Sequence, residues 1–130
     1  MDPHRQTPTS LIRRFDAPDR VVTVDHGQLE VITVGALVIG RGSYGPGWRW
    51  SQTAQVPSHG ERPPEHVGVV LSGRAKVVLE GTEEIDLTPG DFFHIATEFD
   101  SWVVGHRPCE VLYLTGAERL ARRLSATTSA

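Results

Sequence analysis

The chain has 130 residues, the length of one domain, which excludes two full domains. Its 13 basic and 16 acidic residues give a net charge of −3, which argues against a nucleic-acid partner, because phosphate binding needs a basic surplus. A single cysteine, Cys109, excludes an internal disulfide, and the chain shows no signal-peptide pattern and no apolar stretch of about 18 residues. We therefore expect a soluble, cytoplasmic protein without a membrane partner.

Residues 1–15 begin with a polar, proline-containing segment that predicts a flexible N-terminal arm. From Arg20 onward, short runs of β-branched and aromatic residues alternate with glycine, proline and aspartate turns, which is typical of strands. The glycines at 40, 42, 45 and 47 predict a turn-rich stretch, and residues 52–65, with three prolines, predict a long irregular loop. The predicted strands are residues 21–24, 29–34, 36–39, 48–50, 66–71, 75–80, 83–87, 92–95, 101–104 and 110–114.

One helix is expected, near residues 117–124, because Leu120 and Leu124 share a helical face. Thr115 and Glu118 fit a capping box at its start. About ten short strands with no helix among them predict an all-β barrel or sandwich. The expected organisation is an arm at 1–15, a β-barrel at 16–115, and a helix and tail at 116–130.

Residues 66–104 carry a strand, Ser72-Gly73, a short hairpin, and then Pro89-Gly90-Asp91 before the next strand. This order resembles the conserved half of the cupin superfamily. The resemblance implies a jelly-roll β-barrel with a ligand cavity and commonly a dimer. We expect a homodimer in which the early strand 21–24 extends a partner's sheet, with Arg13, Arg14 and Phe15 anchoring the arm.

A metal-binding cupin typically carries three His and one Glu, and this chain departs from that pattern. His66 stands where the Glu is usual, and Ser101 takes the third His position. The segment that would carry the paired His holds Trp48 and Trp50, or Ser51 and Thr53, depending on the length of the gap. A nearer resemblance, to small single-domain cupins, covers residues 47–51, 66–74 and 100–105. There Arg62 replaces a loop Cys and Phe99 replaces a His. These departures from both metal-binding patterns, which leave only His66 in a ligand position, predict that the chain has no tight metal site and no cofactor.

His66 is the best single candidate for chemistry, because it occupies an inward cupin ligand position and imidazole can act as an acid or base near neutral pH. We expect it to be hydrogen-bonded in an apolar, aromatic cavity and to stay neutral near pH 7, because burial lowers its pKa. Asp100 is a candidate to orient it. The candidate walls of the cavity are Trp48, Trp50, Phe92, Phe99 and Ser101.

The favoured function is metal-independent cyclisation, isomerisation or elimination on a small organic molecule, with His66 as acid or base. A second reading is a metal-dependent, dioxygenase-like cupin enzyme in which His59, Glu61 and His66 hold Fe or Zn. A third reading is a non-catalytic domain that binds or senses a small ligand.

Overall fold

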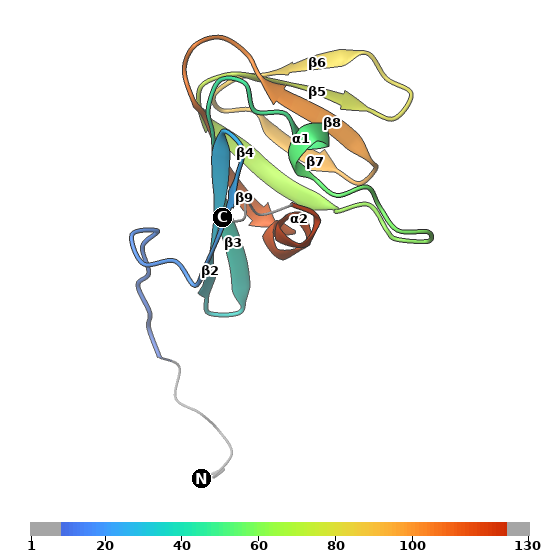
Figure 1. The fold of residues 1–130 in the computed structure, drawn as a ribbon. Coiled ribbons are helices and arrows are strands. Elements are labelled where there is room, and N and C mark those ends of the chain that lie inside the picture. The colour runs from blue at the N-terminus through green and yellow to red at the C-terminus, as the bar shows by residue number, and fades with distance from the viewer. Residues whose placement is uncertain (1–8, 125–130) are drawn as a thin grey trace, which may run out of the picture.

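The computed structural model describes residues 9–124, which fold into two antiparallel β-sheets and two helices (Figure 1). The larger sheet has six strands in the order β1-β2-β3-β9-β4-β7, and the smaller has three in the order β6-β5-β8. The strands are β1 (Arg20–Val24), β2 (Gly27–Val34), β3 (Leu37–Tyr44), β4 (His66–Ser72), β5 (Ala75–Leu79), β6 (Glu84–Leu87), β7 (Phe92–Ile95), β8 (Phe99–Val103) and β9 (Cys109–Thr115). The helices are α1 (Trp50–Thr53) and α2 (Ala117–Arg123).

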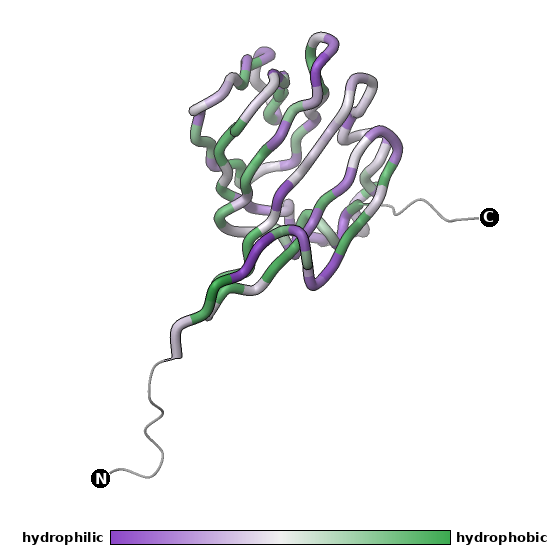
Figure 2. Tube along the Cα trace, turned by 90° about the vertical axis from the view of Figure 1, so that its left-hand side faces the viewer, coloured by the Kyte–Doolittle hydropathy of each residue, from purple (hydrophilic) through white to green (hydrophobic). Residues whose placement is uncertain are grey.

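The core is built from the inward-facing residues of both sheets. Apolar and polar residues alternate along much of the chain trace, as expected for strands with one face buried (Figure 2). Leu29 on β2, Val70 on β4 and Cys109 on β9 are fully buried. The predicted all-β class with a short C-terminal helix is thus confirmed.

Helix α2 packs against β2, β3 and β4 and closes one side of the core. Gly40 on β3 permits this close approach, because a Cβ there would lie 2.7 Å from the Cβ of Ala117. The predicted capping box is wrong. Thr115 is the last residue of β9, the N-cap is Gly116 with φ 81°, and no side chain caps the helix. A left-handed glycine is needed here because the chain turns directly from a strand into the helix.

Two other predictions of local structure are corrected. Strand β3 runs straight through Gly40 and Gly42, which had indicated a turn. Residues 48–50 are not a strand: Arg49 forms a single bridge to Trp102, and Trp50 begins α1. The hydroxyl of Thr53 donates to the carbonyl of Arg49, which holds this one-turn helix closed.

The predicted loop at 52–65 begins within α1 and is otherwise irregular up to β4. Within the described part of the chain, no helix has the length and apolar character needed to cross a membrane.

Candidate active site

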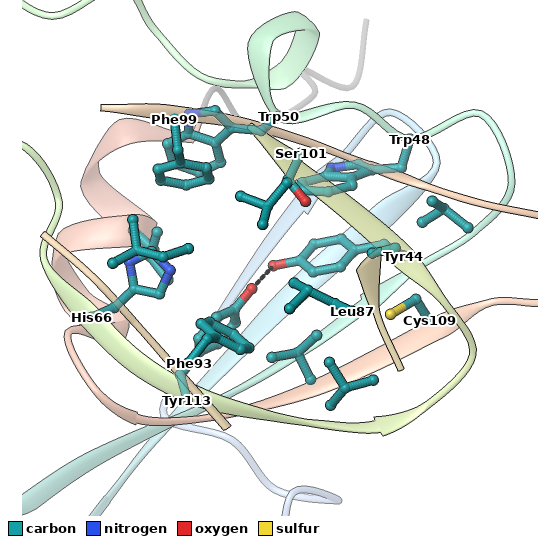
Figure 3. A pocket seen from close by; sticks show the side chains of 17 residues that line it. Tyr44, Trp48, Trp50, His66, Leu87, Phe93, Phe99, Ser101, Cys109 and Tyr113 are labelled. Atoms are coloured by element: carbon teal, nitrogen blue, oxygen red, sulfur yellow. Dashed lines mark hydrogen bonds between the residues drawn. The ribbon is translucent and has the colours of Figure 1, made fainter. Parts of the chain in front are cut away.

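A cavity lies between the two sheets, and side chains from β3 to β9 and from α2 line it (Figure 3). Its volume is about 40 Å³. A single water needs roughly 10–15 Å³ of such space, whereas pockets for larger organic ligands usually measure roughly 300–1,000 Å³. The conformation described here is therefore closed around its own aromatic side chains.

His66, the first residue of β4, is 2% exposed and faces this cavity. The rings of Phe93, Phe99 and Tyr113 surround it, with centroids 5.8, 5.3 and 5.6 Å from the imidazole. Gly116 packs against its Cβ, and a methyl group at that glycine would lie 2.7 Å away. The imidazole is thus held in place by its neighbours on several sides.

The hydrogen bonding of His66 leaves one ring nitrogen available. Nδ1 lies 2.7 Å from the carbonyl oxygen of Pro64, so it carries the proton and donates it. Nε2 has no hydrogen-bond partner among residues 9–124. Burial lowers the pKa of His66 below its usual 6.5, and the Pro64 carbonyl partly opposes that shift. The structure thus places His66 in the expected aromatic surrounding with a hydrogen bond to the backbone, and the direction of its pKa shift favours the neutral imidazole.

The hydroxyls of Tyr44 on β3 and Tyr113 on β9 form a second polar group in the cavity, which no sequence motif indicates. Their oxygens lie 2.9 Å apart, near the middle of the cavity in Figure 3. Burial raises the pKa of both phenols well above the usual 10, so both remain hydroxyls. Gly42 makes room for the Tyr44 ring, because a Cβ at Gly42 would lie 2.5 Å from the Tyr44 hydroxyl.

Two stacked aromatic pairs form one wall of the cavity. Trp48 stacks on Tyr44 at 4.0 Å, and Trp50 stacks on Phe99 at 4.8 Å. The structure therefore brings Trp48, Trp50 and Phe99 to the cavity, as the sequence predicts. The indole N–H of Trp48 is buried and has no hydrogen-bond partner within the described residues.

Phe92 was expected in this wall, but it is 72% exposed and points away from the cavity. Phe93 lines the cavity in its place. Gly68, its register partner on β4, leaves room for the ring, because a Cβ there would lie 2.7 Å from Phe93 Cζ. Since neighbouring residues in a strand face opposite sides, only one of the two phenylalanines can reach the cavity.

Asp100 does not contact His66 and lies on the outer side of β8. Its carboxylate accepts hydrogen bonds from Arg49 Nε at 2.7 Å and from the backbone N–H and hydroxyl of Ser51, each at 3.0 Å. Asp100 therefore ties α1 to β8 and, through α1, supports Trp50. Ser101 does line the cavity, but its hydroxyl donates to the Lys76 carbonyl at 2.8 Å.

The alternative metal ligands do not converge. His59 is exposed in the loop before β4, and Glu61 accepts a hydrogen bond from the Ser58 N–H, with its other oxygen 4.0 Å from Arg123 Nε. Glu61 lines a separate hollow beside α2, not the cavity around His66. Among the residues described, no three His, Cys, Asp or Glu side chains are placed to hold a metal ion. The aromatic surroundings of His66 do not fit the metal that cupins commonly carry.

Neither a scan against protein-family models nor a search of curated proteins returned a match. Solved structures do resemble this chain. The polyketide cyclase RemF from Streptomyces resistomycificus is 19% identical, with a TM-score of 0.57, over 82% of this chain and 78% of that one. Ectoine synthase from P. lautus is 12% identical, with a TM-score of 0.57, over 92% and 93%. The Cnp3 cupin domain from Schizosaccharomyces pombe is 11% identical, with a TM-score of 0.53, over 72% and 65%.

These likenesses, together with the two antiparallel sheets and the cavity between them, show that the chain has a cupin fold. The resemblance seen in the turn motifs of residues 66–104 is thereby confirmed at the level of the fold. At such identities the likeness concerns the fold alone, so activity has to be argued from the site.

Proposed function

We propose that this protein binds a small, largely apolar organic molecule in the cavity between its sheets and catalyses isomerisation, cyclisation or elimination without a metal. His66 is the proposed acid and base. The observation that carries the proposal is its buried imidazole, fixed through Nδ1 on the Pro64 carbonyl, with Nε2 unpartnered among the described residues and the ring in the cavity wall. The proposed setting is the cytoplasm, in keeping with the buried free thiol of Cys109.

The geometry supports proton transfer in two ways. The Pro64 carbonyl fixes the ring orientation and stabilises the imidazolium that forms when Nε2 takes a proton. The lowered pKa keeps the imidazole unprotonated at pH 7, so it is ready to act as a base. Aromatic walls supply flat contact surfaces and exclude water, which strengthens electrostatic interactions inside the cavity.

Substrate entry requires the cavity to open, because about 40 Å³ admits only a few waters. Phe99 is the side chain best placed to move. It is only half-buried, whereas its stacking partner Trp50 is 5% exposed and is the first residue of α1, the helix that Asp100 ties to β8. We propose that rotation of Phe99 off Trp50 admits the substrate beside His66.

The first experiment uses the small-molecule fraction of a cell extract as the probe. Purified protein is incubated with it, washed and denatured, and released compounds are identified by mass spectrometry. Ala75→Val serves as the control, because Ala75 lines the cavity and the larger side chain fills it. We expect compounds retained by the natural chain and not by Ala75→Val, with melting temperatures showing that the variant is folded.

Each retained compound is then incubated with the natural chain and with His66→Gln. We expect turnover by the former and binding without turnover by the latter. A compound that binds and is returned unchanged by both chains would favour the non-catalytic ligand-binding reading. Zn, Fe, Mn, Ni or Cu near one equivalent in untagged protein, lost in His66→Ala, would favour the metal-dependent reading.

A further inference from the structure

We propose that the molecule bound in this cavity is an enolisable carbonyl compound, an aldehyde or ketone with a C–H next to the carbonyl carbon. Its oxygen accepts a hydrogen bond from the Tyr113 hydroxyl while His66 Nε2 takes the proton from the adjacent carbon. This inference rests on the proposed function and adds the chemical class of the substrate.

The tyrosine pair in the cavity has one more hydroxyl hydrogen than its hydrogen bond uses. Tyr44 and Tyr113 each have one, and their oxygens form a single hydrogen bond with each other at 2.9 Å. One of the two hydrogens lies in that bond, and the other has no acceptor among residues 9–124. The side chains are 4% and 6% exposed, and a buried donor without an acceptor is unfavourable. The cavity therefore offers one O–H to whatever occupies it.

Either hydroxyl of the pair can donate to the other, and we choose between the two directions from the positions of the rings. Tyr113 lies beside His66, with ring centroids 5.6 Å apart, whereas Tyr44 is stacked on Trp48 on the other side of the pair. We assign Tyr44 as donor to Tyr113 and Tyr113 as donor to the ligand. In this arrangement the Tyr44 hydrogen bond polarises the Tyr113 hydroxyl and strengthens it as a donor.

The acceptor in the cavity is His66 Nε2, since Nδ1 carries the proton that is donated to Pro64. A ligand that interacts with both the Tyr113 hydroxyl and His66 Nε2 must present an oxygen acceptor to the first and a removable hydrogen to the second. A carboxylate does not fit, because the residues that line the cavity include no Lys or Arg. A carbonyl group with a neighbouring C–H satisfies both demands without a net charge.

The chemical step balances within these groups. The C–H bond next to the carbonyl breaks, its electron pair forms a C=C bond, and the oxygen takes the negative charge while hydrogen-bonded to Tyr113. The proton moves to Nε2, giving an imidazolium whose Nδ1–H remains bonded to the Pro64 carbonyl. Return of that proton to the opposite face of the same carbon inverts a stereocentre there, and in a substrate with a C=C bond conjugated to the enolate its return to the far carbon shifts the double bond; no oxidant, reductant or co-reactant is consumed. Both tyrosines stay protonated during the step because burial raises the pKa of each.

The test uses acetophenone as the probe, because its methyl hydrogens lie next to a carbonyl and its flat ring suits aromatic walls. Ethylbenzene is the matched compound, with CH₂ in place of the carbonyl. Binding of both is measured by saturation-transfer NMR, and exchange of the acetophenone methyl hydrogens in D₂O is followed by proton NMR. The full chain is compared with Tyr113→Phe, Tyr44→Phe and His66→Gln, each checked for folding by circular dichroism.

We expect both compounds to bind and the natural chain to accelerate exchange of acetophenone. His66→Gln should abolish that acceleration, and Tyr113→Phe should reduce it by about a hundredfold, the usual effect of removing one donor to an oxyanion. Tyr44→Phe should reduce it less, because Tyr113 still donates. Ethylbenzene binding should be unchanged in both tyrosine variants.

Two results would contradict the proposal in different ways. If both compounds bind but exchange is not accelerated, or Tyr113→Phe exchanges as fast as the natural chain, the carbonyl assignment is wrong and the apolar cavity of the proposed function stands. If neither compound binds, the proposed function fails together with this inference. Should Tyr113→Phe not fold, Tyr44→Phe still decides the matter, because the assignment requires a smaller but measurable loss.

Discussion

The imidazole of His66 is a base kept in its neutral form by the fold. It is 2% exposed and surrounded by three aromatic rings, so a positive charge there loses most of its hydration. The Pro64 carbonyl compensates in part, but burial is the larger effect and the pKa is lowered. A base whose pKa is lower in the folded state than in the unfolded state makes stability depend on pH.

The direction of that dependence follows from proton binding. Above about pH 6.5 the imidazole is neutral in both states, and its contribution to stability is fully present. As the pH falls below 6.5, the unfolded chain binds a proton that the folded chain does not. The free energy of unfolding should then fall by up to about 1.4 kcal/mol per pH unit, until the pH reaches the lower pKa of the folded state. Urea unfolding between pH 7.5 and 5 measures this pH dependence of the free energy of unfolding, and His66→Gln should make it flatter. An equal slope in the variant would show that other titratable groups cause the dependence.

Strand alternation explains which residues of the site the sequence could predict. His66, Trp48, Trp50, Phe99 and Ser101 were placed in the cavity because the cupin resemblance supplied their positions, and the structure agrees. Once Phe99 and Ser101 face inward, however, Asp100 between them must face outward. That step was available from the sequence, and it would have removed Asp100 as a partner for His66.

At the scale of secondary-structure elements, glycines in strands make room for aromatic rings. Gly42 on β3 lies under the ring of Tyr44, and Gly68 on β4 lies under the ring of Phe93. A glycine-rich run normally predicts a turn, which is why β3 was expected to end at residue 39. These glycines make room for a ring from the same strand, as at Gly42 under Tyr44, or from the neighbouring strand, as at Gly68 under Phe93, and a single sequence without a structure does not specify those contacts.

Gly42→Ala should therefore disrupt the tyrosine pair. A methyl group at this position would lie 2.5 Å from both the Cε2 and the hydroxyl of Tyr44, so the ring has to move and its hydrogen bond to Tyr113 is lost. We expect a loss of about 1–3 kcal/mol in the free energy of unfolding, as for other overpacked cores. The fluorescence of Trp48 should change as well, because Tyr44 stacks on it.

The control for this prediction is Gly45→Ala, where the nearest atom to the new methyl group is the His26 carbonyl oxygen at an ordinary 3.4 Å. We expect the stability of this variant to lie within about 0.5 kcal/mol of the natural chain. Equal losses in the two alanine variants would show that a backbone conformation unfavourable to alanine at both positions, and not crowding of Tyr44, causes the loss.

At the scale of the whole molecule, the turns were the most predictable feature. Gly73 and Gly90 have φ of 75° and 91°, and Asp91 accepts a hydrogen bond from the Thr88 N–H, so the Ser-Gly and Pro-Gly-Asp motifs specify turns by local chemistry. The order of the strands is a different matter. β4 lies between β7 and β9, which are far from it in the sequence. Only the resemblance to cupins indicates pairing of this long-range kind, because local turn chemistry does not specify it.

The six-stranded sheet ends in two edge strands, and we propose that β1 is the edge through which two copies of this chain pair. β1 pairs only with β2 in the described structure, and Val21 on it is 47% exposed. The preceding arm is anchored to its own chain, because Arg13 binds Asp19 at 2.8 Å and the Arg41 guanidinium lies over Phe15. The other edge, β7, has only four residues, and His94 on it contacts Glu65 at 3.0 Å.

Pairing of this kind predicts a particle of twice 14.3 kDa by light scattering at micromolar concentration. Val21→Asp should give the monomer mass, because a carboxylate on an edge strand opposes pairing with a second strand. The control is Phe92→Ser, which removes an exposed apolar side chain from the opposite edge and should leave the dimer intact. A monomer in the natural chain would rule out the dimer, and loss of the dimer in Phe92→Ser but not in Val21→Asp would move the interface to β7.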